Sequence, residues 1–113
     1  MIIDSRVIRA SMGDDPKFIR EAAADFLSGA RADIASITQA ISATDAEGVR
    51  VGSHRVKGAS AMFGANDLKH VCTDLESAAR DIDWKKIQAL VPKLIRCMGE
   101  VEVAIEEFLE RLQ

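Results

Sequence analysis

The sequence predicts an all-α fold, an antiparallel up-down four-helix bundle with a short extra helix at its N-terminus. Apolar residues recur at spacings of three and four through four long segments, which is the period of one helical face. The chain has only two prolines and no tyrosine, a composition that favours helices over strands. The predicted connections are short, so neighbouring helices should run antiparallel. Residues 1–113 suffice for a single domain with its own core.

The first two predicted helices differ in length and in role. Residues 5–12 can form a short helix closed by Gly13, and because it is too short to be stable alone we expect it to lie as a lid on the bundle. Asp15 as N-cap and Pro16 at the first helical position begin a long helix that runs to about Ala43. Its apolar positions are Ile19, Ala22, Ala23, Phe26, Ala30, Ile34, Ile37 and Ile41.

The third and fourth predicted helices meet at a turn that contains Gly64. Thr44 and Glu47 fit a capping box, which predicts a helix over about residues 45–63. Asn66 or Asp67 is expected to cap the next helix. The apolar stripe of that fourth helix is Leu68, Val71, Cys72, Leu75 and Ala79.

The last predicted helix begins at Trp84, with Asp83 as its N-cap. Its apolar positions alternate between steps of four and three, a pattern typical of bundle packing. Pro92 falls inside this helix and should kink its first turns. The apolar positions are Ile87, Val91, Leu94, Met98, Val101, Ile105, Phe108 and Leu112.

Composition argues against several classes of protein. The formal net charge of −3 disfavours nucleic acid as a partner, because binding a phosphate backbone requires a basic face. Charged residues follow Met1 almost at once, unlike a signal peptide, and no apolar run approaches the roughly 18 residues that span a bilayer. Cys72 and Cys97 lack a CxxC or histidine-rich neighbourhood, which favours reduced, buried thiols over a disulfide or a metal site. We therefore expect a cytoplasmic protein without membrane contact.

His54 is the candidate reactive residue. Around it, small or apolar residues define the buried side of the helix, and His54 lies about 140° from the centre of that stripe, so it should point outward. Lys57 follows at i+3 and Gly58 at i+4 on the same outward side. An exposed imidazole beside a cation and a backbone without a side chain is suited to binding an anionic group. Because imidazole titrates near neutral pH, a neutral ring can attack phosphorus, and Lys57 can offset the charge of an incoming phosphoryl group.

Two motifs resemble the histidine phosphotransfer (HPt) family. The family pattern is His, two residues, Lys-Gly and two small residues, then Gly-Ala and a second helix with Leu-x-x-x-Cys-x-x-Leu-Glu. This chain has His54-Arg-Val-Lys57-Gly58-Ala-Ser, then Gly-Ala, then a run from Leu68 to Glu76 with Cys and Leu at the same spacings. The resemblance covers residues 54–76, and the flanking helices account for nearly all the rest of the chain.

The resemblance implies a carrier of phosphoryl groups between receiver domains. Nε2 of His54 would attack the aspartyl phosphate of one receiver and pass the group to another. Glu76 corresponds to the family position that orients the histidine, by accepting a hydrogen bond from Nδ1–H. Gly58 would leave room for the phosphoryl group or the docking receiver. The chain would bind no cofactor or metal, and Mg²⁺ would be supplied by the receiver.

A mixed surface patch around His54 is the expected docking area. Val51, Arg55 and Ala61 share or flank its face, and such a patch suits a transient partner. In the family, the first helix and the start of the second add apolar contacts. Here these would come from Ile8, Phe18 and Ala22.

Other interpretations are kept beside this one. His70 has no Lys-Gly partner and is interpreted as a surface residue paired with Asp74, while Ser60 is interpreted as a core residue. A sensor histidine kinase also phosphorylates a bundle histidine, but the chain has no Gly-rich ATP site and is too short for a nucleotide-binding domain. We thus expect no enzyme. The chain could still be the excised C-terminal segment of a hybrid kinase, or a helical adaptor that only binds.

Overall fold

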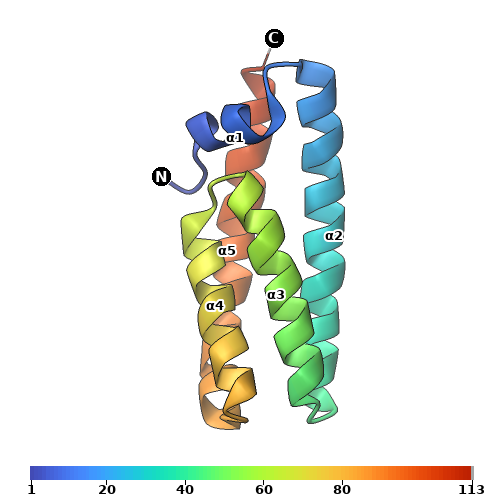
Figure 1. Cartoon of the computed structure of the whole chain (residues 1–113), viewed down its shortest axis with the longest axis vertical. Helices are drawn as coiled ribbons and strands as arrows, with labels where there is room; N and C mark the ends of the chain where they lie inside the picture. The colour runs from blue at the N-terminus through green and yellow to red at the C-terminus, as the bar shows by residue number, and fades with distance from the viewer. Residues whose placement is uncertain (113) are drawn as a thin grey trace.

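Four long helices and one short helix make up the described part of the chain. The computed structural model describes residues 1–112, and among these it contains α1 (Ser5–Met12), α2 (Pro16–Ser42), α3 (Ala46–Met62), α4 (Asn66–Arg80) and α5 (Trp84–Glu110) but no strand. The long helices α2 to α5 lie side by side along the long axis of a molecule that measures 45 × 21 × 20 Å (Figure 1). The all-α prediction and the approximate helix ranges are therefore confirmed.

The packing order of the helices places α3 and α5 diagonally opposite each other. Helix α3 packs against α2 and α4, and α5 packs against the same two helices. Residues from all five helices share one core, which includes Ile19, Phe26, Ile37, Val56, Leu75, Leu94 and Ile105. The outward faces of α3 and α5 consequently point to different sides of the bundle.

Helix α1 covers one end of the bundle, as expected for a lid (Figure 1). The backbone N–H of Asp4 donates to the carbonyl of Phe63 at 3.0 Å, which ties the N-terminal segment to the α3–α4 turn. Gly64 has a positive φ of 62°, and a Cβ there would lie 2.6 Å from Cβ of Asp4, so this turn requires glycine. Ile8 lies on the side of α1 that faces the core and is fully buried. The expectation that Ile8 contributes to a docking surface is therefore wrong, because α1 turns this side chain inward.

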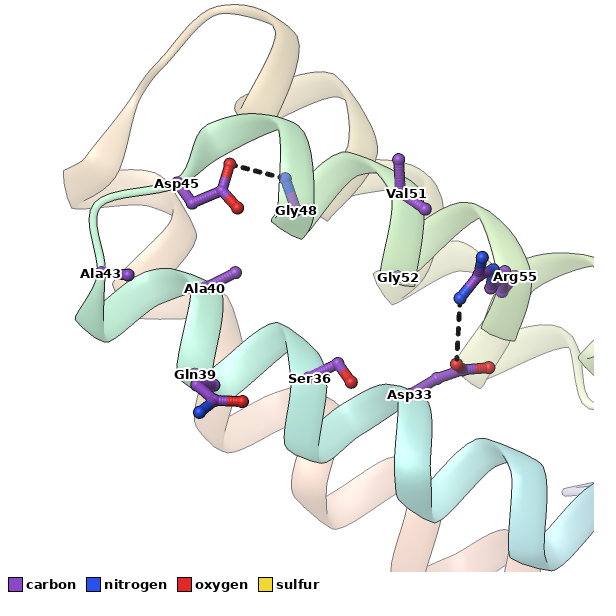
Figure 2. Close-up of a pocket in the computed structure, with 10 residues that line it drawn as sticks. All are labelled: Asp33, Ser36, Gln39, Ala40, Ala43, Asp45, Gly48, Val51, Gly52 and Arg55. Atoms are coloured by element: carbon purple, nitrogen blue, oxygen red, sulfur yellow. Dashed lines mark hydrogen bonds and ion pairs between the residues drawn. The ribbon is translucent and has the colours of Figure 1, made fainter.

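Aspartates begin four of the five helices. The side chains of Asp15 and Asp83 accept backbone N–H groups, as predicted, and Asp4 does the same for α1. At α3 the predicted capping box is wrong, because Thr44 takes a left-handed φ of 55° and Asp45 caps the helix through the N–H of Gly48 (Figure 2).

The start of α4 also departs from the sequence prediction. Neither Asn66 nor Asp67 is its N-cap; Ala65 occupies that position and provides no side-chain hydrogen bond. The tight α3–α4 turn explains this, since Ala65 is buried and its N–H donates to Ser60. Within residues 1–112, no helix is both long enough and apolar enough to cross a bilayer.

Helices α2 and α3 approach closely where small residues of α3 face α2. A Cβ added to Gly52 would lie 2.6 Å from Cγ1 of Ile37, which is fully buried and cannot move aside freely. Gly48 is similarly close to Ala40 (Figure 2). These two glycines allow α2 and α3 to approach closely in the part of α3 that precedes His54.

Replacing Gly52 by Ala should therefore destabilise the protein by about 1–3 kcal/mol, because the extra methyl group overpacks the α2–α3 contact. The matched control is Gly29→Ala in α2, where an added Cβ meets nothing within 4 Å and helix propensity should add up to about 1 kcal/mol. Urea unfolding of both variants measures the difference. Equal effects at the two positions would contradict the close-contact interpretation.

Candidate functional site

His54 lies on the exposed face of α3, as the sequence predicted. Its side chain is 65% exposed, whereas its neighbours Ser53 and Val56 on the other side of the helix are fully buried. An imidazole in this position has one edge in contact with the protein and the other open to solvent.

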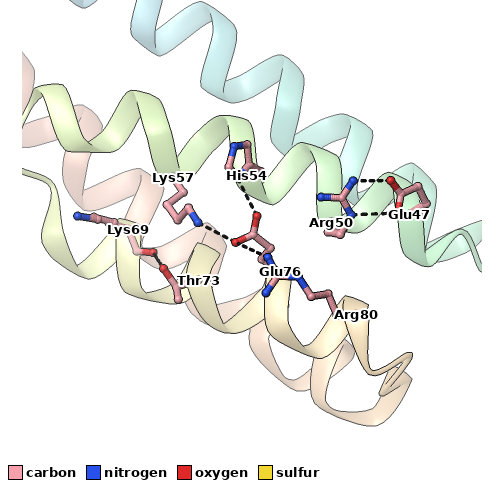
Figure 3. Close-up of polar contacts among 8 residues, drawn as sticks. All are labelled: Glu47, Arg50, His54, Lys57, Lys69, Thr73, Glu76 and Arg80. Carbon is pink, nitrogen blue, oxygen red and sulfur yellow. Dashed lines mark hydrogen bonds and ion pairs between the residues drawn. The ribbon is translucent and has the colours of Figure 1, made fainter.

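Glu76 of α4 is the residue that holds the inner edge of the ring. Its Oε2 lies 2.8 Å from Nδ1 of His54, and its Oε1 accepts a hydrogen bond from Nζ of Lys57 at 2.7 Å (Figure 3). The carboxylate is almost completely buried, with its side chain 4% exposed. The structure thus brings together the three residues that the sequence identified on two separate helices.

The charge state of Glu76 determines which nitrogen of His54 is free. The hydrogen bond from Lys57 holds the pKa of the Glu76 carboxyl below its usual value, and the contact with His54 acts in the same direction, against the opposing effect of burial. Because an ionised carboxylate can only accept, Nδ1 of the ring must carry the proton. In the neutral imidazole, Nε2 then has a free lone pair at the exposed edge.

Comparison with known proteins agrees with this geometry. The model of the Hpt domain family matches residues 21–113 of the chain. The chain belongs to the Hpt domain family. Its function is that of a phosphorelay intermediate, and the partners of such domains are receiver domains.

A solved Hpt structure shares the fold. The crystal structure of histidine-containing phosphotransfer protein B (HptB) from Pseudomonas aeruginosa PAO1 aligns with a TM-score of 0.91 over 99% of this chain and 97% of that one, at 24% sequence identity. A search of curated protein sequences gives no match. The likeness to HptB shows that the two chains share a fold.

Arg80 adds a second cation that sequence analysis did not identify. Its Nη2 lies 3.6 Å from Oε1 of Glu76, the oxygen that Lys57 also contacts (Figure 3). The i,i+4 spacing of Glu76 and Arg80 was the available signal, but it is shared by many solvated helical pairs. Arg50 lies one turn before His54 on α3, but its guanidinium pairs with Glu47 rather than with Glu76 (Figure 3).

The surface of the Hpt domain around His54 is open at Gly58. Gly58 is exposed, and a Cβ added there would meet nothing within 4 Å, so the fold itself does not require glycine. Ala61 is exposed on the same helix and Val51 is half-buried, while Arg55 reaches Asp33 of α2 at 3.9 Å (Figure 2). All three positions are at least partly accessible to solvent, and their role in docking stays a prediction.

Helix α2 supplies the other side of this surface. Phe18 is 50% exposed and Ala22 is half-buried, in contrast to Ile8. Ala22 and Ala59 line a depression of about 300 Å³ between α2 and α3. Met62 is 45% exposed and lines the same depression. Sequence analysis did not identify it, because it is the last residue of α3 and an apolar residue at a helix end gives no sign of its exposure.

The remaining candidate residues take no part in the His54, Lys57 and Glu76 contacts. His70 is exposed on α4, and among residues 1–112 it forms no ion pair with Asp74, so the expected pairing is wrong. Ser60 is buried and donates to the carbonyl of Val56, so it is a core residue as expected. Cys72 and Cys97 are buried free thiols, and burial raises the pKa of Cys72 to about 12. Within the described residues, no three His, Cys, Asp or Glu side chains are placed to hold a metal ion.

Glu76 should make stability depend on pH in a defined direction. Its folded-state pKa is lowered below the ordinary value of 4.5, so its contribution is complete above that value and is lost as the pH falls through the folded-state pKa. Glu76→Gln should lower the free energy of unfolding by about 1–3 kcal/mol at neutral pH. The difference in this free energy between the variant and wild type should become smaller in acid.

Urea unfolding between pH 7 and pH 3 measures this gap. Glu110→Gln, at an exposed position at the end of α5, is the control and should track wild type throughout. A gap that stays constant into acid would show that the carboxylate of Glu76 is not the ionised partner of Lys57 and His54.

Proposed function

We propose that His54 is the phosphoacceptor, which takes a phosphoryl group from the aspartyl phosphate of one receiver domain and passes it to another. The observation that carries this proposal is the pairing of Nδ1 with buried Glu76, because in the neutral ring this pairing leaves the lone pair of Nε2 free at the other edge of a mostly exposed side chain. Nε2 would form the new bond to phosphorus while the bond to the aspartyl oxygen breaks and that oxygen leaves as a carboxylate.

Glu76 would act through the ring rather than on the phosphoryl group. After attack by Nε2, His54 keeps the proton on Nδ1 and the phosphorylated ring carries positive charge. The carboxylate 2.8 Å away stabilises that charge, and its hydrogen bond fixes the orientation of the ring. Glu76 is therefore proposed as a positioning residue.

Lys57 would supply positive charge beside the transfer site. Its Nζ is held 2.7 Å from Oε1 of Glu76, and Lys57 lies one turn from His54 on α3, so its positive charge would offset the charge of an incoming phosphoryl group. Glu76 is already engaged by His54 and Lys57 and therefore presents no free carboxylate to a cation. We thus propose that the chain binds no cofactor and that the receiver supplies Mg²⁺.

The docking area is proposed to comprise Gly58, Val51, Arg55, Ala61, Phe18 and Ala22. The mixture of open backbone, half-buried apolar groups and one charge suits a partner that must bind and leave repeatedly. Docking across both α2 and α3 would bring the receiver beside His54 on the α4 side of α3.

The finer fold is part of the same proposal. Helices α2 to α5 would form an antiparallel up-down four-helix bundle that makes residues 1–113 one Hpt domain; turns of three residues, 43–45, 63–65 and 81–83, link them and support antiparallel neighbours. The cytoplasmic location expected from the sequence stays a prediction.

Phosphotransfer from labelled receivers tests the proposal. Label should move from a phosphorylated receiver of the source organism to wild type and to His70→Gln, the matched control at the only other histidine, but not to His54→Gln. The His54→Gln protein should still fold, because the side chain is mostly exposed. Acid-labile label on His54→Gln would refute the assignment.

The same assay separates the rival functions. Incubation with labelled ATP alone should leave the chain unlabelled, since it is proposed to have no ATP site of its own. Self-labelling would indicate a kinase. Receiver binding without transfer would indicate a binding-only adaptor. A domain excised from a hybrid kinase would transfer like a free one and would differ only in the gene that encodes it.

Gly58→Gln should move stability and transfer in opposite directions. An added side chain meets open space, so helix propensity should stabilise the isolated domain by several tenths of a kcal/mol or more. Because residues i and i+4 of a helix are stacked, the same side chain projects beside His54 and should obstruct the receiver.

Thermal melts and transfer rates measure the two effects. Ala35→Gln, at an exposed position of α2 outside the depression lined by Ala22 and Ala59, is the control and should transfer at the wild-type rate. Unchanged transfer by Gly58→Gln would place the docking face elsewhere on the bundle.

A further inference from the structure

Gly99 lies in the middle of α5 without a structural reason within its own chain. A glycine inside a helix costs about 1 kcal/mol relative to alanine. Gly99 is exposed, and a Cβ added there would meet nothing within 4 Å, so neither close packing nor backbone strain accounts for it. The missing side chain at this position leaves room for the close approach of another molecule, and the residues around it decide whether such a contact is favoured.

The surroundings of Gly99 form an apolar strip. Ile95 and Val103, at i−4 and i+4, are 56% and 54% exposed and lie on the same face of the helix as Gly99. A shallow groove of about 510 Å³ includes Gly99 and Val103, with Arg96 and Glu100 along its side. The strip is therefore a continuous surface with charges at its edge, the composition of a small protein interface.

Charge is distributed unequally along α5. Every basic residue of the helix precedes Gly99 and every acidic residue follows it. A second α5 laid alongside in the same direction would place like charges together, whereas an antiparallel copy places each basic half against an acidic half. The basic residues are Lys85, Lys86, Lys93 and Arg96, and the acidic ones are Glu100, Glu102, Glu106, Glu107 and Glu110.

We propose that this face of α5, defined by Ile95, Gly99 and Val103 with Arg96 and Glu100 at its edge, binds a second copy of the same chain in antiparallel orientation. The contact is isologous, with Gly99 of one copy crossing Gly99 of the other at the two-fold axis. Helix geometry then sets Ile95 of each copy against Val103 of the second, and Arg96 beside Glu100 of the second. Among residues 1–112, neither Arg96 nor Glu100 has an ion-pair partner within its own chain.

Self-association at α5 leaves His54 accessible. Because α3 and α5 lie diagonally in the bundle, the strip faces a different side from the imidazole. Each copy of the dimer would keep its own docking surface for receivers. The inference does not depend on the proposed role of His54, and failure of either leaves the other standing.

Sedimentation equilibrium from about 1 μM to about 1 mM, the range in which small interfaces dissociate, tests the proposal. The wild-type chain should pass from monomer to dimer. Arg96→Glu and Glu100→Arg should each raise the dissociation constant at least about tenfold, because each places like charges together twice across the axis. The double variant restores opposite charges and should recover the wild-type constant.

Cross-linking checks the axis itself. Gly99→Cys should form a disulfide-linked dimer under mild oxidation, because the two copies of residue 99 meet at the axis. The matched control is Gly29→Cys, at an equally open helical glycine on α2, which should give no disulfide-linked dimer because residue 29 lies outside the proposed contact.

Two results would overturn the proposal. One is a wild-type chain that remains monomeric up to about 1 mM, which would mean that no second copy covers the strip. The other is a dimer that neither charge reversal weakens and that Gly99→Cys does not cross-link, which would place the contact on another face. Thermal melts of each variant at low concentration confirm that the compared chains are folded.

Discussion

The site depends on one buried carboxylate. Glu76 is nearly inaccessible to solvent, and burying a charge is costly unless it is paired and hydrogen-bonded. Lys57 and His54 satisfy one oxygen each, at 2.7 and 2.8 Å. Removing Lys57 or His54 would weaken the pairing of a carboxylate that water hardly reaches, so the charge of Glu76 ties the three side chains together.

The fold serves this arrangement by fixing α3 against α4. His54 and Lys57 lie one turn apart on α3 and Glu76 on α4, so their contacts require the two helices to keep one register. The turn between them is tightened by Gly64 and the buried Ala65, and the N-terminal segment is hydrogen-bonded to Phe63 of the same turn. The N-terminal segment thereby restrains the turn at which α3 ends and α4 begins.

Much of this could be predicted from the sequence, because helix periodicity and caps are local properties. The outward direction of His54 follows from the position of the apolar stripe alone, and the family motif identified Lys57 and Glu76. The burial of Glu76 could not be obtained from the pattern, since it depends on how deeply α4 packs. The same reason explains Ile8: its place on an amphipathic helix was clear, but which side α1 presents to the bundle is a tertiary property.

Local competition explains the smaller errors. Both Thr44 and Asp45 are good N-caps, and the sequence does not decide which of them takes the left-handed conformation that ends the α2–α3 turn. Arg80 shows the opposite limit, because an i,i+4 pair on a helix is usually a weak surface contact, and only the burial of Glu76 gives this one its importance.

The two edges of the imidazole have different environments, and this division suits a carrier. Nδ1 is hydrogen-bonded to a carboxylate inside the protein, so the orientation of the ring does not depend on a partner. Nε2 is at the surface, beside a glycine whose missing side chain leaves the approach open. A group bound at such an edge has few contacts with the carrier itself. In the proposed role of His54, each receiver would supply most of the interactions that stabilise the transferring phosphoryl group, which would let the same histidine accept from one receiver and donate to another.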